Sequence, residues 1–233
     1  MSDEDLYFEN GQARSRRFEE GYYGLLDGLE ESRYVFLDGN GLNDITTDCY
    51  TQVIAETGFG TGLNLISLLE RRSHWNKPPA LHYISVEAHP LSRSQFDTCH
   101  RNWPELETWR QQLATAWPEP TLGWHRITIK DISLTMDIFH GPASAWFDKF
   151  PVNHVEHWFL DGFSPSKNPD MWTAELFSNL SHHSQLGTTL ATYSAAGFIR
   201  RGLRDVGFTM SRREGFGQKR EMLTGVFNTP IEK

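Results

Sequence analysis

The stretch VIAETGFGTGLNLISLL, residues 53–69, contains the three local patterns that decide the fold. Its first three residues are apolar and predict a short buried strand. Gly58, Gly60 and Gly62 then predict a tight turn, because glycine adopts backbone conformations that other residues avoid and lets a ligand approach the chain closely. The apolar run over 63–69 predicts a helix. A strand, a glycine-rich turn and a helix in this order are typical of an α/β fold.

The glycine spacing and its acidic flank bear on which ligand this turn would bind. Dinucleotide-binding folds use G-x-G-x-x-G to hold a pyrophosphate, whereas the third glycine here comes one residue earlier. Glu56, directly before the turn, would repel a pyrophosphate but suits the cationic amino-acid end of S-adenosyl-L-methionine. Glu87, at the end of the next predicted strand, is placed to accept hydrogen bonds from ribose hydroxyls. The residues favour S-adenosyl-L-methionine, with a nicotinamide cofactor or a turn without a ligand as alternatives.

Strand and helix patterns alternate along the rest of the chain. Strands are predicted at 81–86, 127–129, 134–139, 157–160 and 188–193, and helices at 92–117 with an interruption at Pro104, at 172–180 and at 195–205. This alternation predicts a mostly parallel, doubly wound sheet, and with the glycine turn described above we expect a Rossmann-like fold that binds S-adenosyl-L-methionine, as in methyltransferases. The last two strands, 208–212 and 221–227, are joined by a loop too short for a crossover helix, so we expect an antiparallel hairpin at the end of the sheet.

The first 48 residues lack this alternation. They are rich in Gly, Asp and Glu and contain one strand-like run, Tyr34-Val35-Phe36-Leu37. We therefore expect residues 1–48 to form an irregular N-terminal extension packed on the core, and residues 49–233 to form the S-adenosyl-L-methionine-binding methyltransferase domain.

Composition narrows the class of protein. The 233 residues carry 22 Lys and Arg against 30 Asp and Glu, a formal charge of −8, which argues against a protein that coats nucleic acid non-specifically but not against a local basic site. No apolar run is long enough to span a bilayer, and the acidic start MSDEDLYFEN has no secretory pattern, so we expect a cytoplasmic protein. The pairs His154/His157 and His182/His183 lack a third ligand at a familiar spacing, so no metal site is expected.

Asp161 follows directly after the predicted strand 157–160. Ligands of open α/β sheets bind beyond the carboxyl ends of the strands, which is where this residue and the loop 162–172 would lie. The loop supplies carboxylates, an amide and aromatic rings. If the methyl acceptor is an amine, a carboxylate can orient it and take up its proton. Asp161 is therefore the candidate catalytic residue, and the alternative is that it only caps the following turn.

Basic residues gather near the C-terminus. Seven of them stand against three acidic residues: Arg200, Arg201, Arg204, Arg212, Arg213, Lys219 and Arg220 against Asp205, Glu214 and Glu221. Such a patch could hold the phosphates of a folded RNA. The residues alone favour the other interpretation, an ordinary solvated face.

Five segments of the chain resemble one known family. The segments are AETGFGTGLN (55–64), WFLDGFSPSKNPDMW (158–172), AAGFIRRGLR (195–204), GFGQKREMLTG (215–225) and GLEESRYVF (28–36). Together they are similar to the methyltransferase domain of MnmC, which modifies the wobble uridine of tRNA. The resemblance extends from about residue 6 to residue 227, and the segment 158–172 is the most specific part of it.

The resemblance implies an activity and a set of site residues. The activity is transfer of a methyl group from S-adenosyl-L-methionine to the primary amine of 5-aminomethyl-2-thiouridine in tRNA. The implied cofactor-binding residues are Glu56, Thr57, Gly58, Gly60, Gly62, Asn64 and Glu87. The implied substrate-binding residues are Glu30, Asp161, Phe163, Lys167, Asn168, Trp172, Arg201, Arg213, Lys219 and Arg220, with Asp161 facing the amine. The resemblance also turns the basic C-terminal residues into an expected tRNA contact.

Two departures from the family pattern leave other functions open. Relatives are expected to carry a Gly-Asp pair after the third sheet strand, near adenine, where this chain has Gly141-Pro142. Many relatives also carry a flavin-dependent oxidase domain, and these 233 residues contain no second glycine-rich dinucleotide turn. A separate or fused oxidase acting one step earlier is therefore an expected partner, whether the chain is free-standing or part of a longer protein. The alternatives are a methyltransferase for another RNA or small-molecule amine, and a tRNA-binding relative without catalysis.

Overall fold

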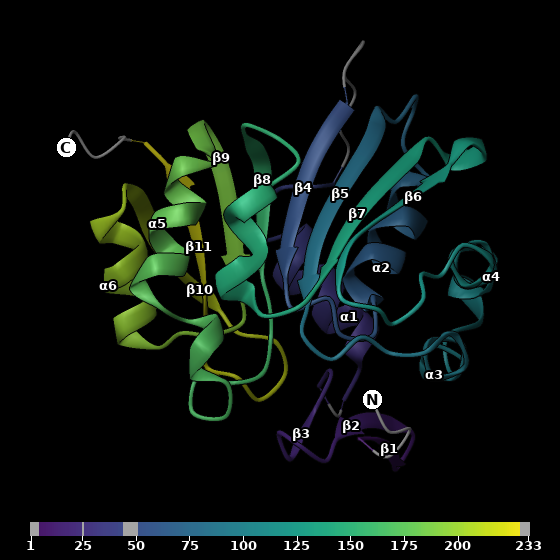
Figure 1. The fold of residues 1–233 in the computed structure, drawn as a ribbon. Helices are drawn as coiled ribbons and strands as arrows, with labels where there is room; N and C mark the ends of the chain where they lie inside the picture. Colours follow the sequence, from purple (N-terminus) through teal and green to yellow (C-terminus); the bar gives the residue numbers. More distant parts are fainter. Residues whose placement is uncertain (1–4, 25, 44–50, 229–233) are drawn as a thin grey trace.

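The computed structural model describes residues 5–24, 26–43 and 51–228. Its centre is an eight-stranded sheet with the order β10-β11-β9-β8-β4-β5-β7-β6 (Figure 1). The strands are β4 (Thr51–Thr57), β5 (Ala80–Glu87), β6 (Gly123–Ile129), β7 (Leu134–His140), β8 (Val155–Leu160), β9 (Ser184–Thr192), β10 (Phe208–Glu214) and β11 (Glu221–Phe227). The predicted boundary between residues 48 and 49 lies outside the described residues.

The middle of the sheet is parallel and both of its edges are antiparallel. The strands β9, β8, β4, β5 and β7 run in the same direction, whereas β6 pairs antiparallel with β7. At the other edge β10 and β11 form the expected antiparallel hairpin, and β11 adds antiparallel to β9. The predictions of a mostly parallel sheet and of a C-terminal hairpin are therefore confirmed.

Helices cover both faces of the sheet. The regular helices are α1 (Gly28–Ser32), α2 (Leu63–Arg72), α3 (Arg93–Cys99), α4 (Glu107–Thr115), α5 (Ala174–His182) and α6 (Gly197–Asp205). One apolar core lies between the sheet and α1, α2 and α4, and the other lies between the sheet and α5 and α6. Successive strand residues alternate between these cores, since Ile54 belongs to the first and Ala55 to the second. None of the described helices combines the length and the apolar composition that crossing a bilayer requires.

The prediction of a strand at Tyr34–Leu37 is wrong. These residues belong to a π-helical turn, Arg33–Leu37, that continues α1. Asp27 starts the helical segment, because its carboxylate accepts hydrogen bonds from the backbone N–H groups of Leu29 and Glu30, each at 3.1 Å. A short apolar run does not distinguish a strand from a buried helical turn, and here every residue from Val35 to Leu37 is buried.

The N-terminal extension is more regular than expected. It contains a three-stranded antiparallel sheet of β1 (Leu6–Glu9), β2 (Gln12–Ser15) and β3 (Glu20–Gly21). We call residues 5–24 the N-terminal unit. It lies beneath the carboxyl ends of the central strands (Figure 1). Tyr23 fixes it there, because its ring packs edge-on against Trp103 with ring centroids 5.2 Å apart.

Candidate active site

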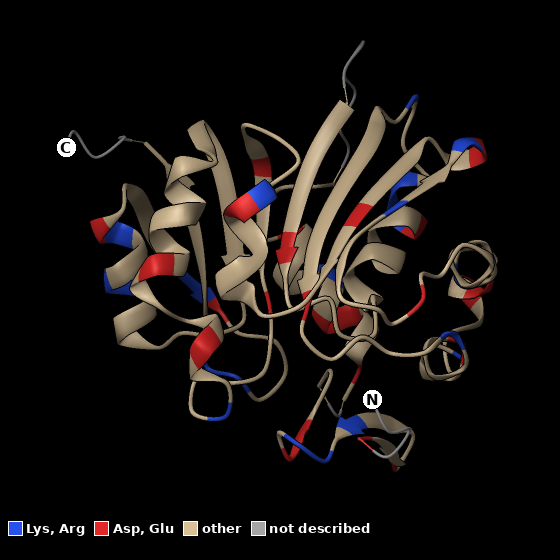
Figure 2. Cartoon of the chain, in the orientation of Figure 1, with Lys and Arg blue, Asp and Glu red and all other residues tan. Residues whose placement is uncertain are grey.

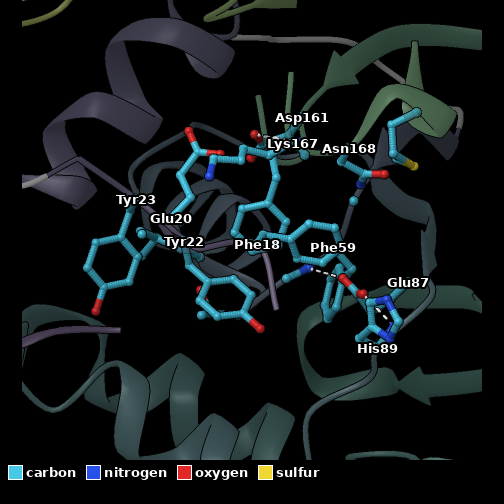
Figure 3. Close-up of a pocket in the computed structure, with 18 of the residues that line it drawn as sticks. Phe18, Glu20, Tyr22, Tyr23, Phe59, Glu87, His89, Asp161, Lys167 and Asn168 are labelled. Carbon is cyan, nitrogen blue, oxygen red and sulfur yellow. Dashed lines mark hydrogen bonds between the residues drawn. The ribbon is translucent and has the colours of Figure 1, made fainter. Parts of the chain in front are cut away.

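A cavity of about 710 Å³ lies between the N-terminal unit and the carboxyl ends of the parallel strands. Each central strand contributes to its lining at the point where the strand ends. Gly58 follows β4, Glu87 ends β5, Gly141 follows β7, Asp161 follows β8 and Tyr193 follows β9. Figure 3 shows part of this lining, with Asp161 and Glu87 contributed by different strands. This is the place where open α/β sheets bind their ligands.

The glycine loop, residues 58–62, requires its glycines for two reasons. Gly58, Gly60 and Gly62 have φ angles of +72°, +55° and +75°, which side-chain-bearing residues rarely adopt. A Cβ atom on Gly58 would also lie only 2.9 Å from the Cα atom of Gly162. The loops that follow β4 and β8 therefore pack backbone against backbone, which brings the glycine loop next to Asp161.

Glu87 presents a fixed carboxylate to the cavity. Its Oε2 accepts a hydrogen bond from the backbone N–H of Gly60 and its Oε1 accepts one from His89, both at 2.7 Å. Burial raises the pKa of Glu87, and the backbone N–H donors of His89 and Gly60 oppose that shift. A carboxylate has about four acceptor sites, so acceptor capacity remains for the two hydroxyls of a ribose. This geometry fits the predicted role of Glu87.

Asn64 connects two buried carboxylates. Its Nδ2 donates to Oε1 of Glu56 at 2.7 Å and to Oδ2 of Asp161 at 2.8 Å, while its Oδ1 accepts from the hydroxyl of Ser32 at 2.6 Å. Glu56 is fully buried and is not part of the cavity lining. Burial and the nearby charge of Asp161 raise the pKa of Glu56 well above its ordinary value. The structure thus places Glu56 behind Asn64, not at the cavity surface where the sequence suggested it would meet a cationic ligand.

Asp161 is held by its backbone and by both of its carboxylate oxygens. Oδ1 accepts from the N–H of Gly162 at 2.8 Å, Oδ2 accepts from Asn64, and the backbone carbonyl accepts from the hydroxyl of Thr57 at 2.8 Å. Burial raises the pKa of Asp161 to about 7, although the hydrogen bonds from Gly162 and Asn64 oppose the shift. A fixed carboxylate that titrates near neutral pH is suited to accept a proton from a bound amine.

The Asp161 loop, residues 161–172, continues the cavity wall. Phe163, Lys167 and Asn168, which the resemblance assigns to substrate binding, line the cavity. Trp172 lies behind them, where it is buried and its indole N–H donates to the carbonyl of Phe163 at 3.2 Å. Trp172 therefore supports the loop and does not form part of the cavity surface.

Of the other predicted substrate residues, one lines this cavity and the rest lie outside its lining. Lys219 lines it, whereas Glu30 does not and instead pairs with Arg33. The neighbouring residue Glu31 lines the cavity in its place. Of the remaining basic residues, Arg201 is exposed on α6, Arg220 is exposed on the β10–β11 loop, and Arg213 lies with its guanidinium 5.1 Å from the ring centroid of Tyr34. On α6 three arginines, Arg200, Arg201 and Arg204, precede one acidic residue, Asp205, at the end of the helix (Figure 2).

Sequence reasoning missed the contribution of the N-terminal unit. Phe18 stacks on Phe163 with ring centroids 4.3 Å apart and an interplanar angle of 21°, and Tyr22 meets Phe163 edge-on. Glu20 accepts a hydrogen bond from the backbone N–H of Ser164 at 2.9 Å, and Lys167 pairs with Glu19 at 3.0 Å. The aromatic segment FEEGYYG, residues 18–24, was the available signal, because such rings are unusual in a charged, irregular extension.

The structure also shows what surrounds Gly141-Pro142 and whether acidic, His and Cys side chains form a metal site. Gly141 and Pro142 line the cavity where relatives were expected to carry an acidic residue, and the N–H of Gly141 donates to the carbonyl of Glu87 at 3.0 Å. This side of the cavity is therefore closed by backbone and by an apolar ring. Within the described residues no group of three or more His, Cys, Asp or Glu side chains could hold a metal ion.

Comparisons with known proteins agree with this geometry. Residues 104–228 match a family model described as S-adenosyl-L-methionine-dependent methyltransferase. The crystal structure of MNMC2 from Aquifex aeolicus superposes with a TM-score of 0.77 at 19% identity, covering 99% of this chain and 72% of that one. A methyltransferase from Pyrococcus furiosus superposes with a TM-score of 0.47 at 13% identity, covering 88% and 86% of the two chains. The likeness to the Aquifex structure shows a shared fold.

Proposed function

Because the chain belongs to the family of S-adenosyl-L-methionine-dependent methyltransferases, we propose that it methylates the primary amine of 5-aminomethyl-2-thiouridine at the wobble position of tRNA, giving 5-methylaminomethyl-2-thiouridine. S-adenosyl-L-methionine is the cofactor. The choice of substrate is supported by the resemblance of the Asp161 loop and the glycine loop to the methyltransferase domain of MnmC.

The observation that carries the proposal is the position of Asp161. Its carboxylate lines the cavity next to the glycine loop, is fixed by Asn64 and Gly162, and has a pKa of about 7. Such a group can orient an incoming amine and accept its proton, which leaves a free lone pair on the nitrogen. A methyltransferase that acts on an anionic oxygen has less use for a base of this kind, because its acceptor carries no proton to remove.

The lining also fits the cofactor. Gly58 and Gly60 of the glycine loop line the cavity, and Glu87 keeps acceptor capacity for a ribose. These residues would hold the nucleoside part of S-adenosyl-L-methionine, which when bound supplies an activated methyl group on a sulfonium. The carboxylates Glu87, Asp161 and Glu31 make this cavity suitable for cationic ligands.

Aromatic side chains at the cavity would receive the uracil ring. Phe163 of the Asp161 loop and Phe18 of the N-terminal unit both line the cavity, with their rings stacked on each other. Bases that are exposed from an RNA stack on such rings. Lys167, Arg201, Arg213 and Arg220 are the candidates for contacts with the tRNA backbone.

Methyl transfer to tRNA of defined modification state tests the proposal. Bulk tRNA carrying the free aminomethyl group should gain one methyl group per wobble uridine, detected by mass spectrometry of digested nucleosides. Bulk tRNA carrying the carboxymethylaminomethyl precursor should remain unchanged, because an oxidase must first remove the carboxymethyl group to free the amine. Binding of the first tRNA without methylation would favour a non-catalytic relative, and methylation at another nucleoside would assign a different amine.

A further inference from the structure

Lys219 has an unexpected position. Its Nζ atom lies 2.8 Å from Oε1 of Glu31 and 4.1 Å from the ring centroid of Tyr193. All three residues line the active-site cavity. The resemblance assigns Lys219 to substrate binding, and its place in a basic segment suggests a phosphate contact, yet its ammonium points to a carboxylate and an aromatic face.

Glu31 and Tyr193 are held in place by groups other than Lys219. Oε2 of Glu31 accepts a hydrogen bond from the backbone N–H of Gly24 at 2.7 Å, and the side chain of Glu31 is only 12% exposed. The hydroxyl of Tyr193 donates to the carbonyl of Gly162 at 2.7 Å, directly after Asp161. The carboxylate and the ring therefore form a site that does not need Lys219 to keep its shape.

A carboxylate beside an aromatic face is the arrangement that recognises alkylammonium ions. The side chain of lysine is itself an n-butylammonium group. Lys219 is 44% exposed and lies on the loop between β10 and β11, so it can leave this position without opening the core. The ammonium of this partly exposed lysine therefore occupies a sheltered site that is suited to the ammonium group of a ligand.

We propose that Glu31 and Tyr193 form a subsite for a primary alkylammonium group of a ligand, and that Lys219 fills this subsite until the ligand displaces it. The proposal rests on the proposed function and names the residues that would receive such a group. Two ligands of this enzyme class carry one: the aminomethyl group of the substrate and the amino-acid end of S-adenosyl-L-methionine.

The subsite itself can be tested without any methyl transfer. Lys219→Ala removes the three outer methylene groups and the ammonium of the occupant, and so opens a space for the ammonium end of n-butylammonium. Calorimetry or ligand-observed NMR should show that this variant binds n-butylammonium at least about tenfold more tightly than wild type, a change of 1.4 kcal/mol, and discriminates against n-butanol. Arg220→Ala, the neighbouring exposed basic residue, should show no such gain. Adding Glu31→Gln or Tyr193→Leu to Lys219→Ala should abolish the gain, whereas Tyr193→Phe should keep much of it because the ring remains.

The Glu31→Gln variant in the otherwise unchanged chain identifies the source of the ammonium group. If the subsite receives the cofactor, affinity for S-adenosylhomocysteine should fall at least about tenfold while affinity for 5′-methylthioadenosine, which lacks the amino-acid end, stays unchanged. If it receives the substrate, both affinities should be unchanged while KM for the aminomethyl tRNA rises.

Failure of this inference is distinct from failure of the proposed function. Equal binding of n-butylammonium by Lys219→Ala and wild type, in a folded variant, would overturn the subsite even if tRNA is methylated. A clear gain in n-butylammonium affinity would support it even if the tested tRNA were not a substrate.

Discussion

The side-chain nitrogen of Asn64 lies 2.8 Å from Oδ2 of Asp161 and 2.7 Å from Oε1 of Glu56, so one amide group serves two buried carboxylates. The amide orientation is fixed, because its oxygen accepts from the hydroxyl of Ser32. Asn64 thus connects Glu56 to the site by hydrogen bonds, although Glu56 does not line the cavity. A hydrogen bond that favours the ionised form of a carboxyl lowers its pKa, so Asn64 helps to keep Asp161 usable as a base near neutral pH.

The first prediction concerns this pair of residues. In wild type the methylation rate should rise with pH through about 7, because Asp161 must be ionised to accept a proton. Asn64→Leu removes the donor, so the midpoint of this profile should move to higher pH and the rate at neutral pH should fall about tenfold or more. Single-turnover rates across neutral pH measure both effects. Ser32→Ala is the milder control, and a profile of Asn64→Leu that coincides with that of wild type would disprove this role.

The second prediction concerns the glycine loop. Gly58 and Gly41 have the same φ angle of +72°, but only Gly58 has a close neighbour, since a Cβ atom on Gly41 would meet nothing within 4 Å. Gly58→Ala and Gly41→Ala therefore carry similar backbone strain, and only Gly58→Ala forces the glycine loop away from Gly162. We expect Gly58→Ala to weaken binding of S-adenosyl-L-methionine at least about tenfold and Gly41→Ala to leave it unchanged. Equal titration curves for the two variants would show that the contact does not shape the site.

Much of the central sheet could be predicted because its strands are short apolar runs separated by glycine turns and helices. The helix after the glycine loop, the break at Pro104 and the final hairpin follow from local chemistry that the fold does not override. The strand at Tyr34–Leu37 was wrong because an apolar run of four residues fits either a strand or a buried helical turn.

The sequence predicted those site residues whose position is set by the end of a strand. It did not predict site contacts between segments that are far apart in the sequence. Asp161 and Glu87 fall at the carboxyl ends of β8 and β5, which the sequence already indicated. The packing of Phe18 on Phe163 joins residues 145 positions apart, and no local pattern encodes it. Likewise, the sequence could not tell that Glu31, not Glu30, turns toward the cavity, because that depends on the phase of a helical turn.

The third prediction concerns the N-terminal unit. Phe18→Ala removes the ring that stacks on Phe163, so we expect kcat/KM for the aminomethyl tRNA to fall about tenfold, while affinity for S-adenosylhomocysteine falls less. Phe8 belongs to the same unit but is 43% exposed, so Phe8→Ala is the matched control. If both variants methylate tRNA as wild type does, the N-terminal unit has no part in substrate recognition.

The fourth prediction concerns tRNA binding by the basic face of α6. Arg201 is exposed near the C-terminal strands, whereas Lys130 is exposed at the opposite end of the sheet, in the turn between β6 and β7. Arg201→Glu should weaken tRNA binding about tenfold at low salt and reduce the slope of log Kd against log salt concentration by about 1, without changing cofactor affinity. Lys130→Glu makes the same change of charge and should leave tRNA binding intact. Equal weakening by both variants would indicate a general effect of net charge.

The most direct test of the account is the methylation rate of Asp161→Asn. The substitution keeps the size of the side chain and one acceptor oxygen, but an amide cannot take up the proton of the substrate amine. The variant should bind S-adenosyl-L-methionine nearly as wild type does and methylate aminomethyl tRNA at least about a hundredfold more slowly in single-turnover experiments. A variant that binds cofactor normally and methylates this tRNA as fast as wild type would contradict the assignment of Asp161 as the base.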